Sequence, residues 1–302
     1  MTAAELKYMF MQAIPDEGSV QEMRIRAGCP IFVRVNGEEV QLNGYADSRL
    51  IRELMELFSN HSLYAYEEEI RQGFLTIEGG HRVGISGKAV LDGDQVRTIK
   101  DISGLNIRLA HERKGCAEKV LPWLYHEGTI QSTLFISPPG GGKTTMLREV
   151  IRNLSDGNPY GNGVAVSVVD ERSEIGACLR GIPQCDLGQR TDIMDGCPKA
   201  LGMTMMIRSM GPKVLAADEI GTKEDLSAIR DALRSGVKIL VTVHGDSLED
   251  VKQKPVLREM VEERMFGRYV VLGCNPRPGT VTKVYDHLCR ELYGGEDENA
   301  SM

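Results

Sequence analysis

The sequence is poor in aromatic residues, has no closely spaced cysteine pair and has no long apolar run, and each absence excludes a class of protein. Aromatic residues make up 5%, and 36 basic against 43 acidic residues give a net charge of −7, so the chain as a whole is not attracted to nucleic acid or anionic lipid. The seven cysteines contain no CxxC pair, which argues against a structural zinc site or a disulfide scaffold and favours reduced, packed thiols. No apolar run approaches the length that crosses a bilayer, and residues 1–17 lack the basic start, apolar core and cleavage site of a signal peptide. We therefore expect a soluble, cytoplasmic protein.

The pattern of strands and turns changes near residue 125, which predicts two domains. In residues 1–125, short strands alternate with hairpin turns around Gly79 and Gly93, the second turn joining separate strands over 88–91 and 95–99. A helix is expected over Ser48–Ser59, with Ser48 as its cap. This half is predicted to be an α+β domain.

Residues 126–293 have a different pattern of apolar and polar residues. Continuous apolar strands alternate with amphipathic segments, which is typical of an α/β domain whose mostly parallel sheet is covered by helices on both faces. The remaining residues, 294–302, are acidic and lack apolar anchors, so we expect a disordered tail.

A glycine-rich segment, SPPGGGKTT, follows the apolar strand Thr133–Ile136 and precedes a helix expected over Lys143–Leu154. In that context it matches the phosphate-binding pattern GxxxxGK[ST], in which glycines let backbone N–H groups surround phosphate oxygens and the helix start adds a positive dipole end. Lys143 is predicted to reach the β- and γ-phosphates of ATP, and the Thr144 hydroxyl to ligate Mg²⁺. The predicted nucleotide-binding residues are Ser137, Pro138, Pro139, Gly140, Gly141, Gly142, Lys143, Thr144 and Thr145.

Ser137 departs from this pattern, because a glycine is usual at that position. If the position requires a positive φ, serine carries a strain of about 1 kcal/mol, and nucleotide binding is weaker. A glycine- and proline-rich turn that merely resembles a phosphate loop is the alternative.

Two acidic residues follow another apolar strand in the segment VLAADEI, over Val214–Ile220. Ligands bind at the carboxyl edge of open α/β sheets, so Asp218 is predicted to hold Mg²⁺ and Glu219 to orient and deprotonate the attacking water. The alternative is a solvated strand end that carries two acids.

Two further strands end in polar residues. VAVSVVDERSE carries Asp170, a second predicted metal ligand, together with Glu171 and Glu174, and ILVTVHG ends at His244. If these strands are neighbours of the phosphate loop, their ends lie on the same sheet edge. A histidine there can sense the γ-phosphate, although a lone histidine is more often structural.

Together these motifs resemble the secretion and pilus-retraction ATPases, a hexameric branch of the P-loop NTPases with a RecA/AAA-like fold, and more closely the stage III sporulation AA family. Four segments here are similar to the motifs of this family: SPPGGGKTT, VVDERSE, GPKVLAADEIG (Gly211–Gly221) and VHG (Val243–Gly245). In that order, they look like Walker A, the Asp box, Walker B and the His box. Carried across, Glu219 matches the Walker B glutamate and His244 the His-box histidine. The stretch Met23–Glu38 is similar to the PAS-like N-terminal domain of these motors, so the resemblance covers residues 20–290.

The resemblance implies arginines that act on the nucleotide of a neighbouring subunit in a ring, which suits the spread of transition-state charge over phosphoryl oxygens. The candidates are Arg82, Arg108 and Arg208, although each is as compatible with an ordinary surface arginine.

The expected function is that of an ATP-hydrolysing ring motor with Mg²⁺ as its metal. By resemblance it docks on a membrane partner such as stage III sporulation protein AB, on the mother-cell side, and energises a channel to the forespore. One alternative is a P-loop ATPase acting on nucleic acid, which the low aromatic content and the absence of a dense basic stretch disfavour. Another is a nucleotide-binding ring scaffold with negligible turnover.

Overall fold

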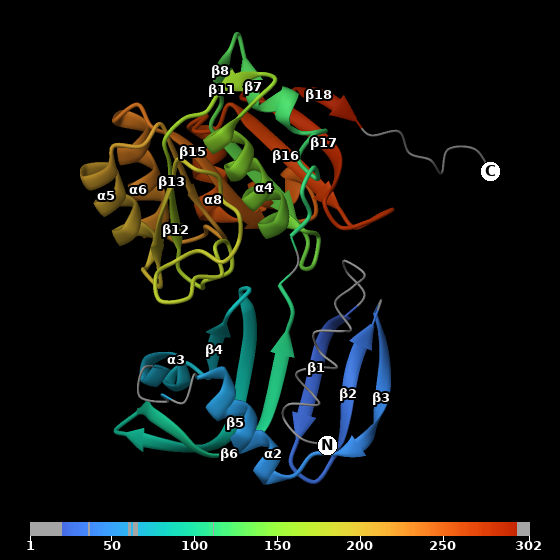
Figure 1. Ribbon diagram of the computed structural model, residues 1–302. Coiled ribbons are helices and arrows are strands. Elements are labelled where there is room, and N and C mark those ends of the chain that lie inside the picture. The colour runs from blue at the N-terminus through green and yellow to red at the C-terminus, as the bar shows by residue number, and fades with distance from the viewer. Residues whose placement is uncertain (1–19, 36, 60–61, 63–65, 111, 295–302) are drawn as a thin grey trace, which may run out of the picture. The chain divides into compact units, whose positions relative to one another are not determined.

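The computed structural model describes residues 20–294 apart from 36, 60–61, 63–65 and 111 (Figure 1). These residues form two compact units. The first contains residues 20–110 together with Ala177–Arg180, and the second contains Glu112–Gly176 and the chain from Gly181 onward. We describe each unit by itself.

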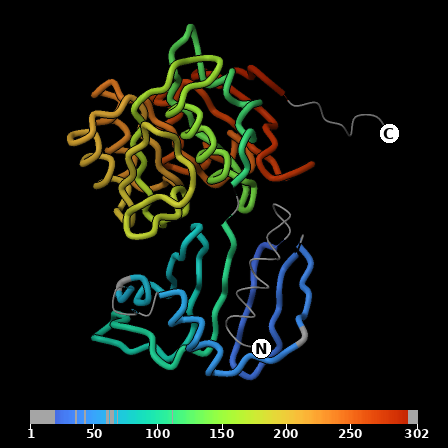
Figure 2. The backbone as a smooth tube through the Cα atoms, viewed as in Figure 1, coloured from blue at the N-terminus to red at the C-terminus, as the bar shows by residue number. Residues whose placement is uncertain are grey.

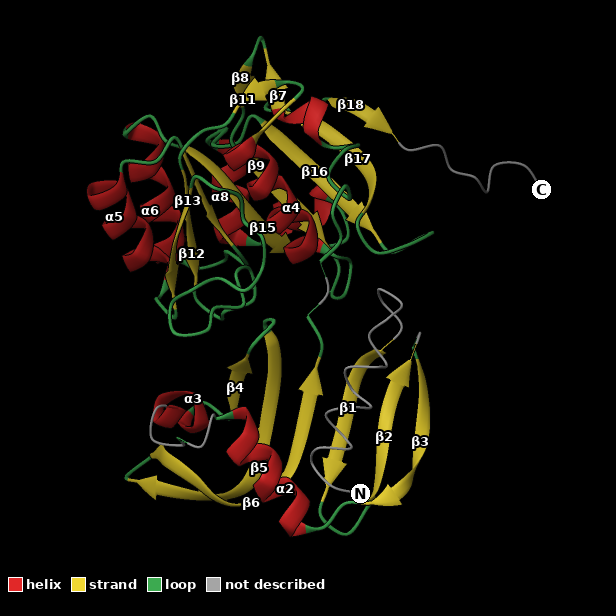
Figure 3. Ribbon diagram, in the orientation of Figure 1, coloured by secondary structure: helices red, strands yellow, loops and turns green. Residues whose placement is uncertain are grey.

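Within the described residues, the first unit is a six-stranded sheet with two α-helices. Its elements are β1 (Val20–Arg26), β2 (Pro30–Val35), β3 (Glu38–Tyr45), α2 (Ser48–Phe58), α3 (Glu67–Arg71), β4 (Phe74–Ile77), β5 (His81–Asp92) and β6 (Gln95–Arg108). The strand order is β3-β2-β1-β6-β5-β4, and every pair is antiparallel (Figure 3). Apolar side chains of alternate strand positions pack against α2 and α3 on one face, so the opposite face keeps the polar residues.

Helix α2 begins where the sequence predicts, but its cap differs. Asp47, not Ser48, is the N-cap: its carboxylate accepts the N–H of Leu50 at 2.8 Å. Aspartate is at least as good a cap as serine, and Ser48 becomes the first helical residue. Leu50, Ile51, Leu54 and Met55 then form the buried stripe of the helix.

The predicted second hairpin is a continuation of the first. β5 and β6 are single long strands paired from Arg82↔Arg108 to Asp92↔Gln95, rather than separate short ones. The register shifts between Ser86 and Lys88, and a Cβ on Gly87 would lie 2.7 Å from the carbonyl oxygen of Lys100. Gly87 therefore marks an irregularity within one long strand and not a break between two strands.

The unit boundary lies near residue 111, whereas the sequence placed it at 125. Ala117, Val120, Leu121 and Leu124 are fully or almost fully buried in a core shared with the helix after the phosphate loop. Residues 112–125 therefore belong with the second unit because that is where their apolar side chains are removed from water.

The second unit contains a large sheet and five α-helices within the described residues (Figures 1 and 2). Its elements are η2 (Leu121–Leu124), β7 (Tyr125–His126), β8 (Thr129–Ile130), β9 (Thr133–Ser137), α4 (Lys143–Asp156), β10 (Gly157–Asn158), β11 (Gly161–Asn162), β12 (Val166–Asp170), β13 (Thr191–Asp195), α5 (Lys199–Met210), β14 (Val214–Ala217), α6 (Lys223–Arg234), β15 (Lys238–His244), α7 (Leu248–Gln253), α8 (Pro255–Glu262), β16 (Arg268–Gly273), β17 (Thr280–Asp286) and β18 (Glu291–Gly294).

The main sheet has the order β13-β12-β14-β15-β9-β16-β17-β18. The first five pairings are parallel, and the two that add β17 and β18 are antiparallel. The strand β9, which leads into the phosphate loop, lies between β15 and β16. The carboxyl ends of β12, β14, β15, β9 and β16 therefore meet at one edge.

Helices cover both faces of this sheet, and side chains alternate between two cores. Leu134 and Ile136 of β9 face the core beneath α5, α6, α7 and α8, whereas Phe135 faces the core beneath α4. Because both faces are buried, the strands read as continuous apolar runs. Gly294 ends β18, so the rest of the expected tail, 295–302, lies outside the described residues. No helix in the described part of the chain is long and apolar enough to cross a membrane.

Candidate nucleotide site

The loop between β9 and α4 has the backbone of a phosphate-binding turn. Gly140 and Gly142 have φ values of 72° and 80°, a left-handed conformation that strains any residue with a Cβ, and Gly142 is the N-cap of α4. A Cβ on Gly141 would lie 2.1 Å from the Ser137 hydroxyl oxygen, so only glycine fits there. The loop thus brings the free N–H groups at the start of α4 to the carboxyl edge of the sheet.

Ser137 carries no backbone strain. It is the last residue of β9, is fully buried, and is not among the residues with positive φ. Its hydroxyl donates to the carbonyl oxygen of Pro138 at 3.1 Å. The strain considered from the sequence is absent, because this loop starts from extended strand backbone.

A turn near the carboxyl end of β16 supports the loop from outside. The N–H of Gly279 donates to the carbonyl oxygen of Gly141 at 2.9 Å, and a Cβ on Gly142 would lie 2.8 Å from the Gly279 nitrogen. This turn contains Arg277, Pro278 and Gly279. The structure places this turn against the phosphate loop.

Asp218 is held at the loop by two hydroxyl groups. Thr144 Oγ1 donates to Asp218 Oδ2 at 2.6 Å, and the Thr242 hydroxyl of β15 donates to Asp218 Oδ1. Thr242 Oγ1 in turn accepts the N–H of Glu219 at 2.9 Å. A single buried threonine therefore fixes both acids that follow β14.

Glu219 lies among a lysine, an arginine and a histidine. Its Oε1 is 3.1 Å from Lys143 Nζ and 2.9 Å from His244 Nε2, and its Oε2 is 3.0 Å from an Arg172 nitrogen. Burial acts to raise the pKa of Glu219, but Lys143, His244 and Arg172 outweigh it and hold the pKa below its ordinary value. Its φ of 50° is left-handed, a strained conformation that tends to occur where function requires it.

His244 ends β15 directly beside Ser137, its partner on β9. Its ring nitrogens lie 3.2 and 3.3 Å from Lys143 Nζ, and Lys254 donates to its carbonyl oxygen at 2.5 Å. Lys143, Asp218, Glu219 and His244 are thus brought together from three neighbouring strands.

Asp170, predicted as a metal ligand, braces its own loop. It is 1% exposed, and its carboxylate accepts the N–H groups of Glu174, Ile175 and Gly176 at 2.8 to 2.9 Å. Burial raises the pKa of Asp170 to about 6 against the opposing effect of these donors. Through these hydrogen bonds the Asp170 carboxylate stabilises the turn at 171–176.

Glu171 and Glu174 line a pocket of about 250 Å³ that also reaches Asp218 and Glu219. Glu171 forms an ion pair with Lys199 at the start of α5. Arg172 lines the same pocket, between the two glutamates in sequence. The Asp-box segment therefore faces the acids of β14 across one cavity.

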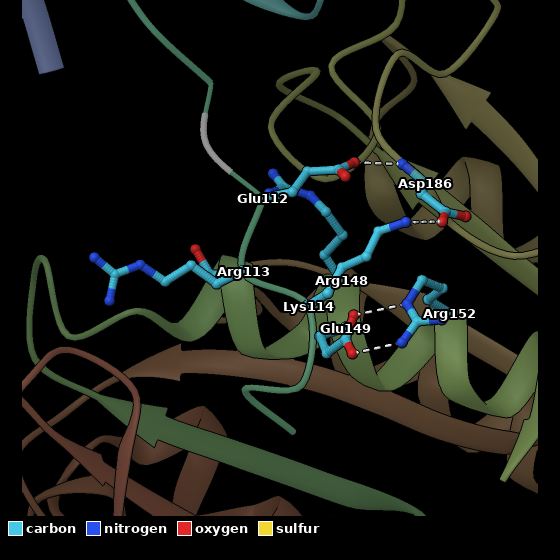
Figure 4. Close-up of a pocket in the computed structure, with 8 residues that line it drawn as sticks. Glu112, Arg113, Lys114, Arg148, Glu149, Arg152 and Asp186 are labelled. Carbon is cyan, nitrogen blue, oxygen red and sulfur yellow. Dashed lines mark hydrogen bonds and ion pairs between the residues drawn. The ribbon is translucent and has the colours of Figure 1, made fainter. Parts of the chain in front are cut away.

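A second pocket, of about 210 Å³, lies beside Thr145 on the other side of the loop (Figure 4). Glu149 of α4 accepts two hydrogen bonds from Arg152 at 2.7 and 2.8 Å and one from the N–H of Gly115 at 2.8 Å. Lys114 pairs with Asp186 at 2.7 Å, while Arg113 points away from this network (Figure 4). The Gly115 hydrogen bond ties this segment to α4, and the Lys114–Asp186 ion pair ties it to the loop that precedes β13.

The donor set at the loop fits Mg²⁺. Mg²⁺ prefers oxygen ligands, keeps several waters and is commonly bound by one or two carboxylates together with substrate phosphates. Thr144 and Asp218 bring a hydroxyl and a carboxylate within 2.6 Å of each other at the start of α4. In the described part of the chain no cluster of three or more His, Cys, Asp or Glu side chains could hold a metal ion, so a metal there needs the phosphates as ligands.

The three arginines predicted to act between subunits lie in different places. Arg82 and Arg108 belong to the first unit, directly opposite each other on β5 and β6. Arg82 also stacks on Phe74, with its guanidinium carbon 3.6 Å from the ring centroid. Arg208 is exposed in the last turn of α5. Their roles stay predictions.

Sequence reasoning missed Arg172 and Thr242. Arg172 lies within DERSE, a segment in which roles were predicted for the acidic residues alone. Thr242 is a polar residue inside an otherwise apolar strand, ILVTVH, two positions before the predicted histidine. That interruption of the apolar run was the available signal, because a buried hydroxyl needs a partner.

The fold is similar to that of secretion and pilus ATPases of known structure. The ATPase DotB of Legionella pneumophila aligns with a TM-score of 0.62 and 14% identity, covering 90% of this chain and 76% of that one. The pilus retraction motor PilT, solved with bound ADP, aligns with a TM-score of 0.60 and 14% identity, covering 87% and 76%. At this identity the likeness is one of fold.

The chain belongs to the family described as sporulation stage III, protein AA, whose sequence profile matches residues 1–292. Stage III sporulation protein AA of Bacillus subtilis (strain 168) is 43% identical over 278 residues, which are 91% of this chain and 90% of that protein. The family resemblance read from the motifs is thereby confirmed.

Proposed function

We propose that this protein is an ATP-hydrolysing motor subunit. The observation that supports it most is the convergence of Lys143, Thr144, Asp218 and Glu219 on one glycine loop, within contacts of 2.6 to 3.1 Å. A loop of this shape binds phosphates through backbone N–H groups, and the acids that follow β14 lie at the same sheet edge, where the terminal phosphate would end. The fold shared with DotB and PilT agrees with this assignment.

In this proposal Gly140 to Thr145 bind the triphosphate, and Lys143 leaves Glu219 to contact the β- and γ-phosphates. Glu219 then orients a water molecule and accepts its proton as the water oxygen bonds to the γ-phosphorus. The bond from that phosphorus to the bridging oxygen breaks, and ADP carries the electron pair away. Bound Mg²⁺, held through Thr144 and Asp218, neutralises charge on the phosphate oxygens.

The same proposal includes the assembly. A head-to-tail ring would let arginines of one subunit reach the nucleotide of the next, and Arg82 and Arg108, opposite each other on β5 and β6, are the candidates in the first unit. By family, we propose a hexameric ring that acts on the cytoplasmic side of a sporulation membrane through a partner such as stage III sporulation protein AB, energising a channel between mother cell and forespore. We also propose that the first unit is a PAS-like domain.

Phosphate release from ATP by the wild-type chain, Lys143→Ala and Glu219→Gln tests the chemistry. We expect turnover in the wild type and a loss of about 10²-fold or more in Glu219→Gln, the size of a lost general base. Equal rates in all three proteins would remove the enzyme assignment. Light scattering with and without ATP tests ring assembly. If nucleotide binding assembles the ring, the measured mass should rise severalfold when ATP is added. A mass that stays at the monomer value would argue against the ring.

A further inference from the structure

The carboxylate of Glu219 is divided between two kinds of partner. Its Oε1 contacts Lys143 and His244, whereas its Oε2 pairs with Arg172 at 3.0 Å. When ATP enters, Lys143 is withdrawn to the phosphates. Arg172 then still pairs with Glu219, because it contacts Oε2, whereas Lys143 contacts Oε1.

The backbone beneath Arg172 is fixed. Asp170, the residue two before it, accepts three N–H groups of residues 174 to 176, and the Ser173 hydroxyl donates to Asp195 of β13. Ser173 has a φ of 52°, a left-handed turn that these bonds maintain. The loop therefore presents Arg172 from a rigid base, which is what a positioning group requires.

We propose that Arg172 is a positioning residue for ATP hydrolysis: its guanidinium holds Oε2 of Glu219 so that Oε1 faces the attacking water. This inference rests on the proposed function. Arg172 acts through Glu219 and forms no bond to the reacting atoms. An orientation error of about 1 Å at such a carboxylate costs up to about 10²-fold in rate.

Stability alone does not account for the contact. The Arg172 side chain is 65% exposed, and exposed ion pairs contribute little to folding because water screens them. Glu219 is meanwhile held in a strained backbone conformation by Asp218 and Thr242. With the backbone already fixed, what the arginine adds is control of the side-chain orientation.

The experiment compares Arg172→Ala and Arg172→Lys with a matched control, Arg290→Ala. Arg290 is an arginine of similar exposure, 69%, in an ion pair with Asp286 in the same unit, outside the residues at the loop. ATP turnover gives kcat and KM, and titration with a fluorescent ATP analogue gives nucleotide affinity. Each Arg172 variant is also made in the Glu219→Gln background.

We expect Arg172→Ala to lower kcat by roughly 10- to 100-fold, with KM and nucleotide affinity within about twofold of wild type, whereas Arg290→Ala changes neither. Arg172→Lys should recover part of kcat, because its ammonium still reaches the carboxylate but lacks the planar geometry of guanidinium. In the Glu219→Gln background, Arg172→Ala should cause no further loss.

Three outcomes overturn the inference. Wild-type kcat in Arg172→Ala shows that Glu219 needs no such anchor. A loss of nucleotide affinity that persists in the Glu219→Gln background shows that Arg172 contacts the nucleotide itself. A wild-type chain that turns over no more ATP than Lys143→Ala removes the proposed function, and this inference with it.

Discussion

Lys143 Nζ lies 3.1 Å from Oε1 of Glu219, so the lysine that should grip the phosphates is paired with the acid that should activate water. In the proposed mechanism these two groups separate before catalysis. The nucleotide would therefore compete with an internal carboxylate for the same ammonium group.

The first prediction concerns this competition. Glu219→Gln keeps the size of the side chain but removes its charge, so Lys143 is released and ATP analogue binding should tighten, by up to about 5-fold for a competing ion pair of up to about 1 kcal/mol. Fluorescence titration measures it, with Glu262→Gln on α8 as an exposed control. Weaker binding by Glu219→Gln would show that the glutamate helps to hold the nucleotide.

The second prediction concerns Thr242, whose hydroxyl joins the two acids. Thr242→Val preserves the shape but removes one of the donors to Asp218 and one of the acceptors of the Glu219 N–H, so the free energy of unfolding should fall by about 1–3 kcal/mol. ATP turnover should fall with it. Urea denaturation and phosphate release check the two effects, and Thr242→Ser should restore both. A valine variant as active as wild type would mean that the strand backbone alone positions the acids.

The third prediction concerns the contact between the phosphate loop and the turn at Gly279. Gly142→Ala adds a Cβ 2.8 Å from the Gly279 nitrogen at a φ of 80°, so the loop must shift and nucleotide binding should be lost. Gly221→Ala is the matched control, since a Cβ there has open space and no positive φ. Calorimetric titration with ADP distinguishes them: equal affinities would show that the loop adapts freely.

The fourth prediction concerns the pH dependence of stability through Glu149 (Figure 4). Burial acts to raise its pKa, but Arg152, the Gly115 N–H and Asn153 outweigh burial and lower it below the usual value near 4.5. A lowered folded-state pKa contributes stability above the unfolded pKa and loses it as pH falls through the folded one. The difference in unfolding free energy between wild type and Glu149→Gln, about 1–3 kcal/mol near pH 7, should therefore shrink as pH falls from about 6 to 3. Urea unfolding across that range measures it; a constant difference contradicts the charged pair.

The fifth prediction separates action within a subunit from action between subunits. Arg108→Ala and Glu219→Gln should each be nearly inactive as pure proteins. If Arg108 acts on a neighbour's nucleotide, mixed rings contain some interfaces in which both groups are intact, so the mixture should exceed the average of the two. Mixing Lys143→Ala with Glu219→Gln, two defects in one site, is the control that should stay inactive. No gain in the first mixture would rule out a role across the interface.

The sequence was sufficient for the parts of the site that follow strand ends. Asp218 and Glu219 follow β14, His244 ends β15, and Lys143 follows the loop after β9; parallel strands bring such positions to one edge. The strand β9 was also predicted within one residue at each end, because both of its faces are buried and its apolar run is continuous.

Contacts that depend on loop paths could not be read in this way. The pairing of Arg172 with Glu219 joins residues 47 positions apart through a turn whose shape is set by hydrogen bonds to Asp170. The support of Gly141 by Gly279 requires β16 to lie beside β9, and nothing in either segment alone specifies that neighbour. The unit boundary near 111 likewise depends on which core receives Ala117 and Leu124.

The bond from Gly279 to Gly141 has a mechanical consequence. It joins the phosphate loop to the turn between β16 and β17, and β17 pairs in turn with β18 at the edge of the sheet. In the proposed motor, a movement of the phosphate loop would therefore reach the C-terminal strands through this turn.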